Sequence, residues 1–160
     1  MRNELALGLM VVLSLLLTML LELIPLPLAL NLNPWRAPWL LVMVMFWILY
    51  LPTVIGIGVA WITGLFLDAT SAAPLGTHAL VFTVASALTL AARRLLLTFS
   101  VIQQAIWIAA LSIIQHGILL LILPSTGLSG MLQSALSAGL FWLALHFVLF
   151  PWVGPRLRTH

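Results

Sequence analysis

Long runs of apolar residues, interrupted at a few points by proline, glycine or arginine, constrain this chain more than any other feature. The runs are about 15 to 23 residues long, close to the length that a helix needs to cross a membrane. Only 6% of the residues are charged, against about 25% in a soluble domain. So few charges cannot cover a surface that faces water, and lipid must therefore be the solvent for most of the exterior.

A lipid surrounding limits the choice of fold. Every backbone N–H and C=O in the bilayer core needs a partner within the protein, which leaves helix bundles or closed barrels. Barrel strands alternate apolar and polar residues, whereas these runs are apolar without interruption. The sequence therefore predicts an all-α membrane protein, a bundle of about six transmembrane helices.

The predicted spans form a single transmembrane domain over residues 1–160. They cover residues 5–24, 37–51, 53–69, 77–92, 101–123 and 131–153. The first run is too long for the core of a typical signal peptide, and it leads into Pro25-Leu26-Pro27 without a small-x-small cleavage site. We interpret it as a retained helix. Arg93-Arg94 ends the fourth span, and Pro151, Gly154 and Pro155 close the sixth.

The arginines indicate the orientation. With six spans and a cytoplasmic N-terminus, five of the six arginines are cytoplasmic, as expected for short loops, and only Arg36 is outside. The cytoplasmic ones are Arg2, Arg93, Arg94, Arg156 and Arg158. A five-span alternative with the N-terminus outside also places five arginines inside, so the count does not decide between them. The C-terminus is cytoplasmic in both topologies.

The second and third spans distinguish these two topologies. As one helix they would contain about 33 residues and measure about 50 Å, too long for a bilayer core of about 30 Å. Pro52 lies near the middle, and we therefore prefer a tight hairpin there. It would give two short helices that are tilted or that do not span fully.

Small residues at four-residue spacing mark two candidate faces for docking a partner helix. The third span carries Gly56, Ala60 and Gly64, and the sixth carries Ala135 and Gly139. Spacing of four keeps residues on one helical face, and small side chains let another helix approach closely. The alternative is that these faces pack only against the chain's own helices.

Polar residues suggest a cluster at the outer ends of the spans. Glu22, Arg36, Asp68 and His78 come out at similar depth, and we expect Arg36 to pair with Asp68 or Glu22. An ionised carboxylate at mid-membrane costs about 3 kcal/mol or more, so such groups belong near the interface or beside a partner. The alternative is that each group is separately solvated there.

Further polar side chains lie deeper in the last two spans. Ser112, Gln115 and His116 lie in the fifth span, and His146 lies in the sixth. Polar residues on such faces most often form hydrogen bonds between helices. A structural role is therefore favoured over a role as ligand or proton relay.

No signature of catalysis or of cofactor binding is present. The sequence has no His-Glu-x-x-His zinc motif, no Gly-x-Ser-x-Gly elbow, no phosphate-binding Gly-x-x-x-x-Gly-Lys loop and no cysteine. We predict a protein that is not an enzyme and that has no cofactor and no metal. The high pI is explained by arginines at span ends and does not indicate a nucleic-acid partner.

The region from Pro34 through Gly76 resembles the MreD family of rod shape-determining membrane proteins. The matching elements are an ordered set: Pro34, Trp39, Trp47-Ile48-Leu49, Pro52, Gly56, Gly64, Leu67-Asp68, Ser71 and Leu75-Gly76. Chain length, span number and a basic C-terminal tip also fit. The fifth span departs from the family pattern, since it has Gln115-His116 where an acidic residue is expected.

The resemblance implies what composition cannot show. MreD-like proteins are scaffolds in the bacterial inner membrane that bind MreC and so act indirectly with MreB filaments and with the glycosyltransferase and transpeptidase of lateral peptidoglycan synthesis. The family is also distantly similar to substrate-binding subunits of energy-coupling-factor transporters. A small-molecule-binding or transporter-type subunit is therefore the alternative function, and it predicts a cavity lined by the polar groups of the fifth and sixth spans.

Overall fold

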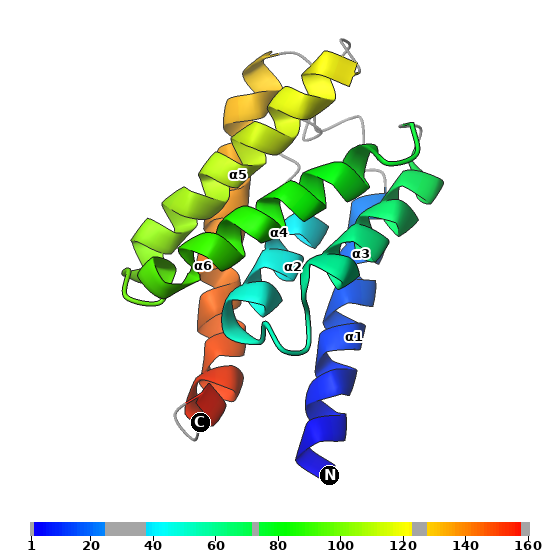
Figure 1. Ribbon diagram of the computed structural model, residues 1–160. Coiled ribbons are helices and arrows are strands. Elements are labelled where there is room, and N and C mark those ends of the chain that lie inside the picture. The colour runs from blue at the N-terminus through cyan, green and yellow to red at the C-terminus, as the bar shows by residue number, and fades with distance from the viewer. Residues whose placement is uncertain (1, 25–37, 72–73, 123–127, 158–160) are drawn as a thin grey trace. The chain divides into compact units, whose positions relative to one another are not determined.

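The computed structural model describes residues 2–24, 38–71, 74–122 and 128–157, and these form six helices (Figure 1). Their bounds are α1 Arg2–Leu23, α2 Trp39–Tyr50, α3 Ile57–Thr70, α4 Thr77–Leu96, α5 Val101–Ile122 and α6 Leu128–Leu157. Each helix coincides with one predicted span to within a few residues. The predicted all-α class is confirmed, and the apolar runs do form helices.

Four of the helices are long and apolar enough to cross a membrane: α1, α4, α5 and α6. The other two are shorter, since α2 has 12 residues and α3 has 14. They measure about 18 and 21 Å, less than the thickness of a bilayer core of about 30 Å. Pro52 explains why α2 ends where it does, because proline has no N–H to donate and its ring clashes with the preceding helical turn.

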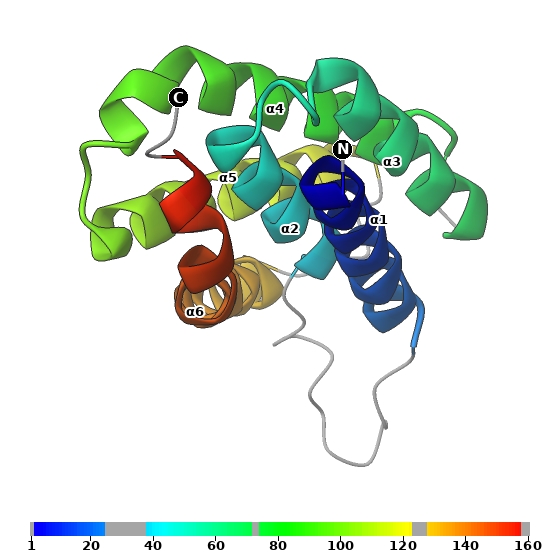
Figure 2. The ribbon, with the colours of Figure 1, turned by 90° about the horizontal axis from the view of Figure 1, so that it is seen from below.

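The chain divides into two compact units. The first contains α1, α2, α3 and α4 as far as Leu90, and the second contains the end of α4 from Ala91 together with α5 and α6. In the first unit α1 lies alongside α2 in both views (Figures 1 and 2). In the second unit α5 packs along α6.

The contact between α1 and α2 is carried by a narrow polar stripe. The indole Nε1 of Trp47 donates to the hydroxyl of Ser14 at 2.9 Å, and the backbone N–H of Leu40 donates to Glu22 at 3.4 Å. Thr18 lies between them on α1, is buried, and donates to the carbonyl of Ser14. Ser14, Thr18 and Glu22 are four residues apart, so a single face of α1 supplies this contact.

The remaining faces of α1 carry exposed leucines, whereas α2 is buried at every residue from Leu40 to Tyr50. In lipid this distribution is favourable, because apolar side chains on the outside meet a solvent as apolar as themselves. The hydrogen-bonded groups then face inward.

Two helices extend beyond the predicted ends of their spans. The helix α4 continues through Arg93-Arg94 to Leu96, because arginine is a good helix former and its charge limits the depth of membrane crossing, not the helix. The helix α6 likewise continues through Pro151 and Pro155 to Leu157. In the third span, helix α3 begins only at Ile57, since residues 52–56 form the turn after α2.

Candidate functional site

The carboxylate of Asp68 makes four hydrogen-bonding contacts with residues around the start of α4. Its Oδ1 accepts from the backbone N–H of His78 at 2.9 Å and lies 2.8 Å from the ring Nδ1 of the same residue. Its Oδ2 accepts from the N–H groups of Gly76 at 2.9 Å and Ala79 at 3.2 Å. The Asp68 side chain is fully enclosed, and that of His78 is only 12% exposed.

These donors belong to the start of α4. The first backbone N–H groups of any helix lack partners within that helix, and together with the helix dipole they favour a negative charge. Asp68, near the end of α3, supplies that charge from the preceding helix. The carboxylate therefore joins the end of α3 to the start of α4 and removes the penalty that an unpaired acid would carry at this depth.

The turn between the two helices is shaped to allow this contact. Gly76 has φ +98, a left-handed conformation that glycine adopts readily and that residues with a Cβ rarely adopt. The hydroxyl and the N–H of Thr77 both donate to the carbonyl of Pro74, at 2.8 and 3.2 Å. Thus the turn is fixed at Gly76, whose N–H faces the carboxylate.

Gly64 lies one helical turn before Asp68 and packs against the same part of α4. A Cβ added at Gly64 would lie 2.5 Å from the Cα and 2.6 Å from the N of Ala79. No side chain fits there without displacement of the α4 backbone. We refer to Gly64, Asp68, Gly76, His78 and Ala79 as the α3–α4 clasp.

Of the four residues in the predicted outer polar cluster, two contact each other, a third has a different partner, and the fourth lies outside the described residues. Asp68 and His78 are brought into direct contact in the clasp. Glu22 lies on α1 and accepts from the N–H of Leu40 in α2. Arg36 lies outside the described residues, so its pairing with Asp68 or Glu22 stays a prediction.

The candidate docking residues of the third span have different surroundings. Ala60 and Gly64 are buried, and Gly64 abuts α4 of the same chain. Gly56 precedes the helix as its N-cap residue, and a Cβ there would meet nothing within 4 Å. The small-residue spacing thus indicated a close helix approach, and at Gly64 the approaching helix is the chain's own α4.

The candidate residues of the sixth span lie on α6, next to α5 in the second unit. Ala135 is buried, and a Cβ at Gly139 would lie 3.6 Å from the carbonyl oxygen of Ala105 on α5. The hydroxyls of Ser112 and Ser134 are 3.1 Å apart and share a hydrogen bond between the two helices. For Ser112 this contact is a structural role of the predicted kind, and for Gln115 and His116 a structural role stays a prediction.

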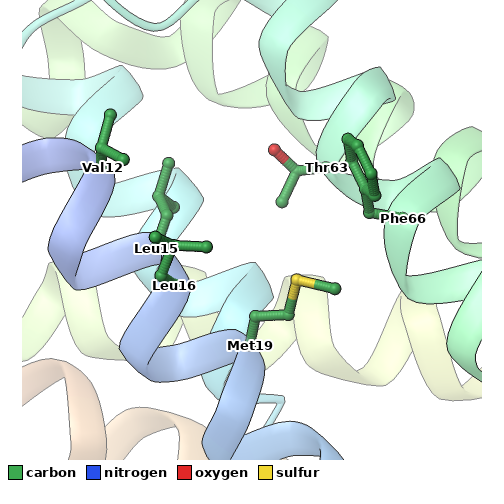
Figure 3. A pocket seen from close by; sticks show the side chains of 6 residues that line it. All are labelled: Val12, Leu15, Leu16, Met19, Thr63 and Phe66. Atoms are coloured by element: carbon green, nitrogen blue, oxygen red, sulfur yellow. The ribbon is translucent and has the colours of Figure 1, made fainter.

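A groove runs between α1 and α3 in the first unit (Figure 3). Its volume is about 150 Å³ and its walls are almost wholly apolar. The lining residues are Val12, Leu15, Leu16 and Met19 from α1 and Thr63 and Phe66 from α3. The hydroxyl of Thr63 donates to the carbonyl of Val59 at 2.7 Å, so the groove offers no unpaired polar group to an occupant.

Sequence reasoning missed two features of this region. The α1–α3 groove depends on the angle between two helices, which no local pattern specifies. The polar stripe of Ser14, Thr18 and Glu22 does have a signal, its four-residue spacing on an otherwise apolar helix. Among the described residues no group of three potential metal ligands occurs.

The fold and these contacts define a class: an all-helical membrane protein in which several polar side chains join neighbouring helices. The chain matches the family described as rod shape-determining protein MreD over residues 2–158. This match covers nearly the whole chain, so the protein belongs to the MreD family and has a role in rod shape determination. No solved structure matches it.

Proposed function

We propose that this protein is a non-enzymatic scaffold of the cell-elongation machinery that binds MreC in the bacterial inner membrane. The observation that carries the proposal is the family match over residues 2–158. Through MreC the scaffold would act indirectly with MreB filaments and with the enzymes of lateral peptidoglycan synthesis. The available surfaces suit such a role, because the described chain consists almost entirely of apolar helices.

In the proposed topology all six helices cross the bilayer, and both termini are cytoplasmic. The separation of α2 from α3 by a turn supports six crossings over five, since α2 ends at Tyr50 and α3 begins only at Ile57. The excess of arginine on the cytoplasmic side agrees with this orientation.

The partner's transmembrane helix is proposed to dock at the groove between α1 and α3. The face at Gly64 is already occupied by α4, and Gly139 lies against α5. The groove lies near the middle of α1 and is apolar, so a leucine or phenylalanine from another helix could enter without leaving a polar group unpaired. Close packing of this kind drives helix association in membranes, where no hydrophobic effect operates between helices.

Co-purification tests this proposal. The protein is extracted in mild detergent, and the proteins recovered with it are identified and quantified. Leu16→Trp fills the groove and should reduce the recovery of MreC about tenfold or more, the loss expected for removing one central anchor. Leu140→Trp places the same bulk on an exposed position of α6 and is the matched control.

Equal recovery of MreC with both variants would remove the groove as the docking site. Recovery of a bound vitamin or lipid precursor, with no elongation protein, would favour the small-molecule-binding alternative. That alternative predicted a cavity lined by the polar groups of the fifth and sixth spans, and one of those groups, Ser112, is paired with Ser134 of α6.

A further inference from the structure

The α2–α3 hairpin is shallower than the helix it packs against. The pairs Glu22–Leu40 and Ser14–Trp47 set α2 antiparallel to α1. Continuing this register places Tyr50, the last residue of α2, beside Val11. From that level α1 extends a further nine residues to Arg2, about 13 Å along the helix axis.

The turn after α2 spans only part of this distance. Residues 51–55 fold into one tight turn, in which the N–H groups of Val54 and Ile55 both donate to the carbonyl of Leu51. One such turn adds about 5 Å, so the tip of the hairpin lies about 20 Å from the level of Glu22. In the same direction the apolar part of α1 covers about 24 Å from Glu22 to Ala6, and an unperturbed bilayer core is about 30 Å thick. Figure 1 shows the turn well above the N-terminal end of α1.

The groups at the tip need polar partners that the described chain does not supply. No described residue accepts a hydrogen bond from the backbone N–H groups of Ile57, Gly58 or Val59. The N-cap residue Gly56 has no side chain to accept from them. Ile57 and Gly58 are exposed, so these N–H groups lie at the surface and not in a packed interior.

The side chain of Thr53 gives independent evidence that the tip of the hairpin has polar surroundings. The other threonines of the described residues donate their hydroxyl protons to a backbone carbonyl or, for Thr89, to the sulfur of Met45. The exposed hydroxyl of Thr53 has no partner within the described chain. A hydroxyl in lipid would donate to a nearby backbone carbonyl, whereas one in water has no need to.

We propose that the bilayer is thinned beside the α2–α3 hairpin, so that water and lipid headgroups reach its tip. An unpaired backbone N–H does not persist in the hydrocarbon region, because nothing there can accept from it. The hydrocarbon must therefore end at the tip, about 20 Å from the level of Glu22, where an unperturbed core would be about 30 Å thick. Short hydrophobic segments are accommodated in this way, by local thinning of the membrane.

Cysteine labelling tests this inference directly, since the natural chain contains no cysteine. Single variants are reconstituted in vesicles, which are opened by freeze–thaw so that a membrane-impermeant maleimide reaches both faces. Gly58→Cys fits without a clash, because a Cβ there meets nothing within 4 Å. Ile62→Cys lies one turn further along α3 on the same face, is half-exposed, and is the matched control.

We expect Gly58→Cys and Thr53→Cys to react about tenfold or more faster than Ile62→Cys, since only the first two lie in the polar phase. If all three variants react equally slowly, the tip lies in hydrocarbon and the inference is overturned. If Ile62→Cys reacts as fast as the others, this side of α3 is solvated along its length and thinning confined to the tip is also overturned. Size-exclusion chromatography confirms that each variant is folded, and Thr53→Cys preserves the test if Gly58→Cys is not.

Discussion

Removal of the Asp68 carboxylate should destabilise the protein more than any other single polar change in the first unit. Asp68→Ala deprives three backbone N–H groups and the His78 ring of their acceptor. Each hydrogen bond to a charged group contributes about 1.5–3 kcal/mol, but such contributions are not additive. Because His78 is partly exposed, water can enter the vacated space, and we expect a net loss of about 3 kcal/mol, the lower end for a broken buried charge contact.

Two further variants separate the contributions within the clasp. Asp68→Asn keeps one acceptor oxygen but turns an amide NH₂ towards two N–H donors, and it should cost about 2 kcal/mol. His78→Ala removes the ring contact and leaves the three backbone donors on the carboxylate, so it should cost only about 1 kcal/mol.

The assay is thermal unfolding in mild detergent, followed by tryptophan fluorescence and by the fraction that remains monodisperse. A loss of about 3 kcal/mol corresponds to a fall of about 6–12 °C in the apparent Tm. Thr70→Ala, at an exposed position of α3, is the control and should change stability by no more than about 0.5 kcal/mol. If Asp68→Ala and Asp68→Asn both behave like this control, the carboxylate does not hold α4 and the reasoning is refuted.

Two more predictions concern helix contacts in the first unit. Gly64→Ala should destabilise by about 1–3 kcal/mol in the same assay, because its Cβ meets the α4 backbone, whereas Gly58→Ala has open space and should be neutral or slightly stabilising; equal effects would contradict the close approach at Gly64. Trp47→Phe retains an aromatic ring in the buried site and loses only the indole N–H donation to α1, so it should cost about 1 kcal/mol, and Trp47→Ala about 3–5 kcal/mol. If Trp47→Phe were as unstable as Trp47→Ala, the hydrogen bond and not the buried ring would account for most of the stabilisation by Trp47.

The helices themselves could be predicted from the sequence because their signals are local. Apolar runs and the proline at position 52 placed all six helices to within a few residues. The spans predicted to end near Arg93-Arg94 and Pro151 belong to helices that continue to Leu96 and Leu157, because a charge limits the depth of membrane crossing and does not by itself end a helix.

The contacts of the clasp could not be predicted, although its residues were singled out. The charge of Asp68 suggested a cationic partner, but its partners are mostly backbone N–H groups, which every sequence contains. The small residue at Gly64 indicated close approach to a helix without specifying which one. Both questions depend on how α4 crosses α3, and no pattern within either segment encodes that geometry.

The depth of the α2–α3 hairpin could be predicted only in part. Its short helices were expected from their length, whereas the register that places the tip about 20 Å from the level of Glu22 depends on two contacts between α1 and α2. The sequence carries one indication that α3 begins outside the lipid. Gly56 and Gly58 flank the start of α3, where a helix that begins in lipid would need a side chain to cap it.

Site-specific photo-crosslinking in cells tests most directly the central claim, that an MreC helix docks at the α1–α3 groove. A photoreactive amino acid replaces Leu16 or Phe66 in the groove, or Ile106 on an exposed part of α5 as the control. We predict an adduct with MreC from both groove positions and none from Ile106. The claim is contradicted if neither groove position yields an MreC adduct in cells that keep their rod shape, or if Ile106 alone does.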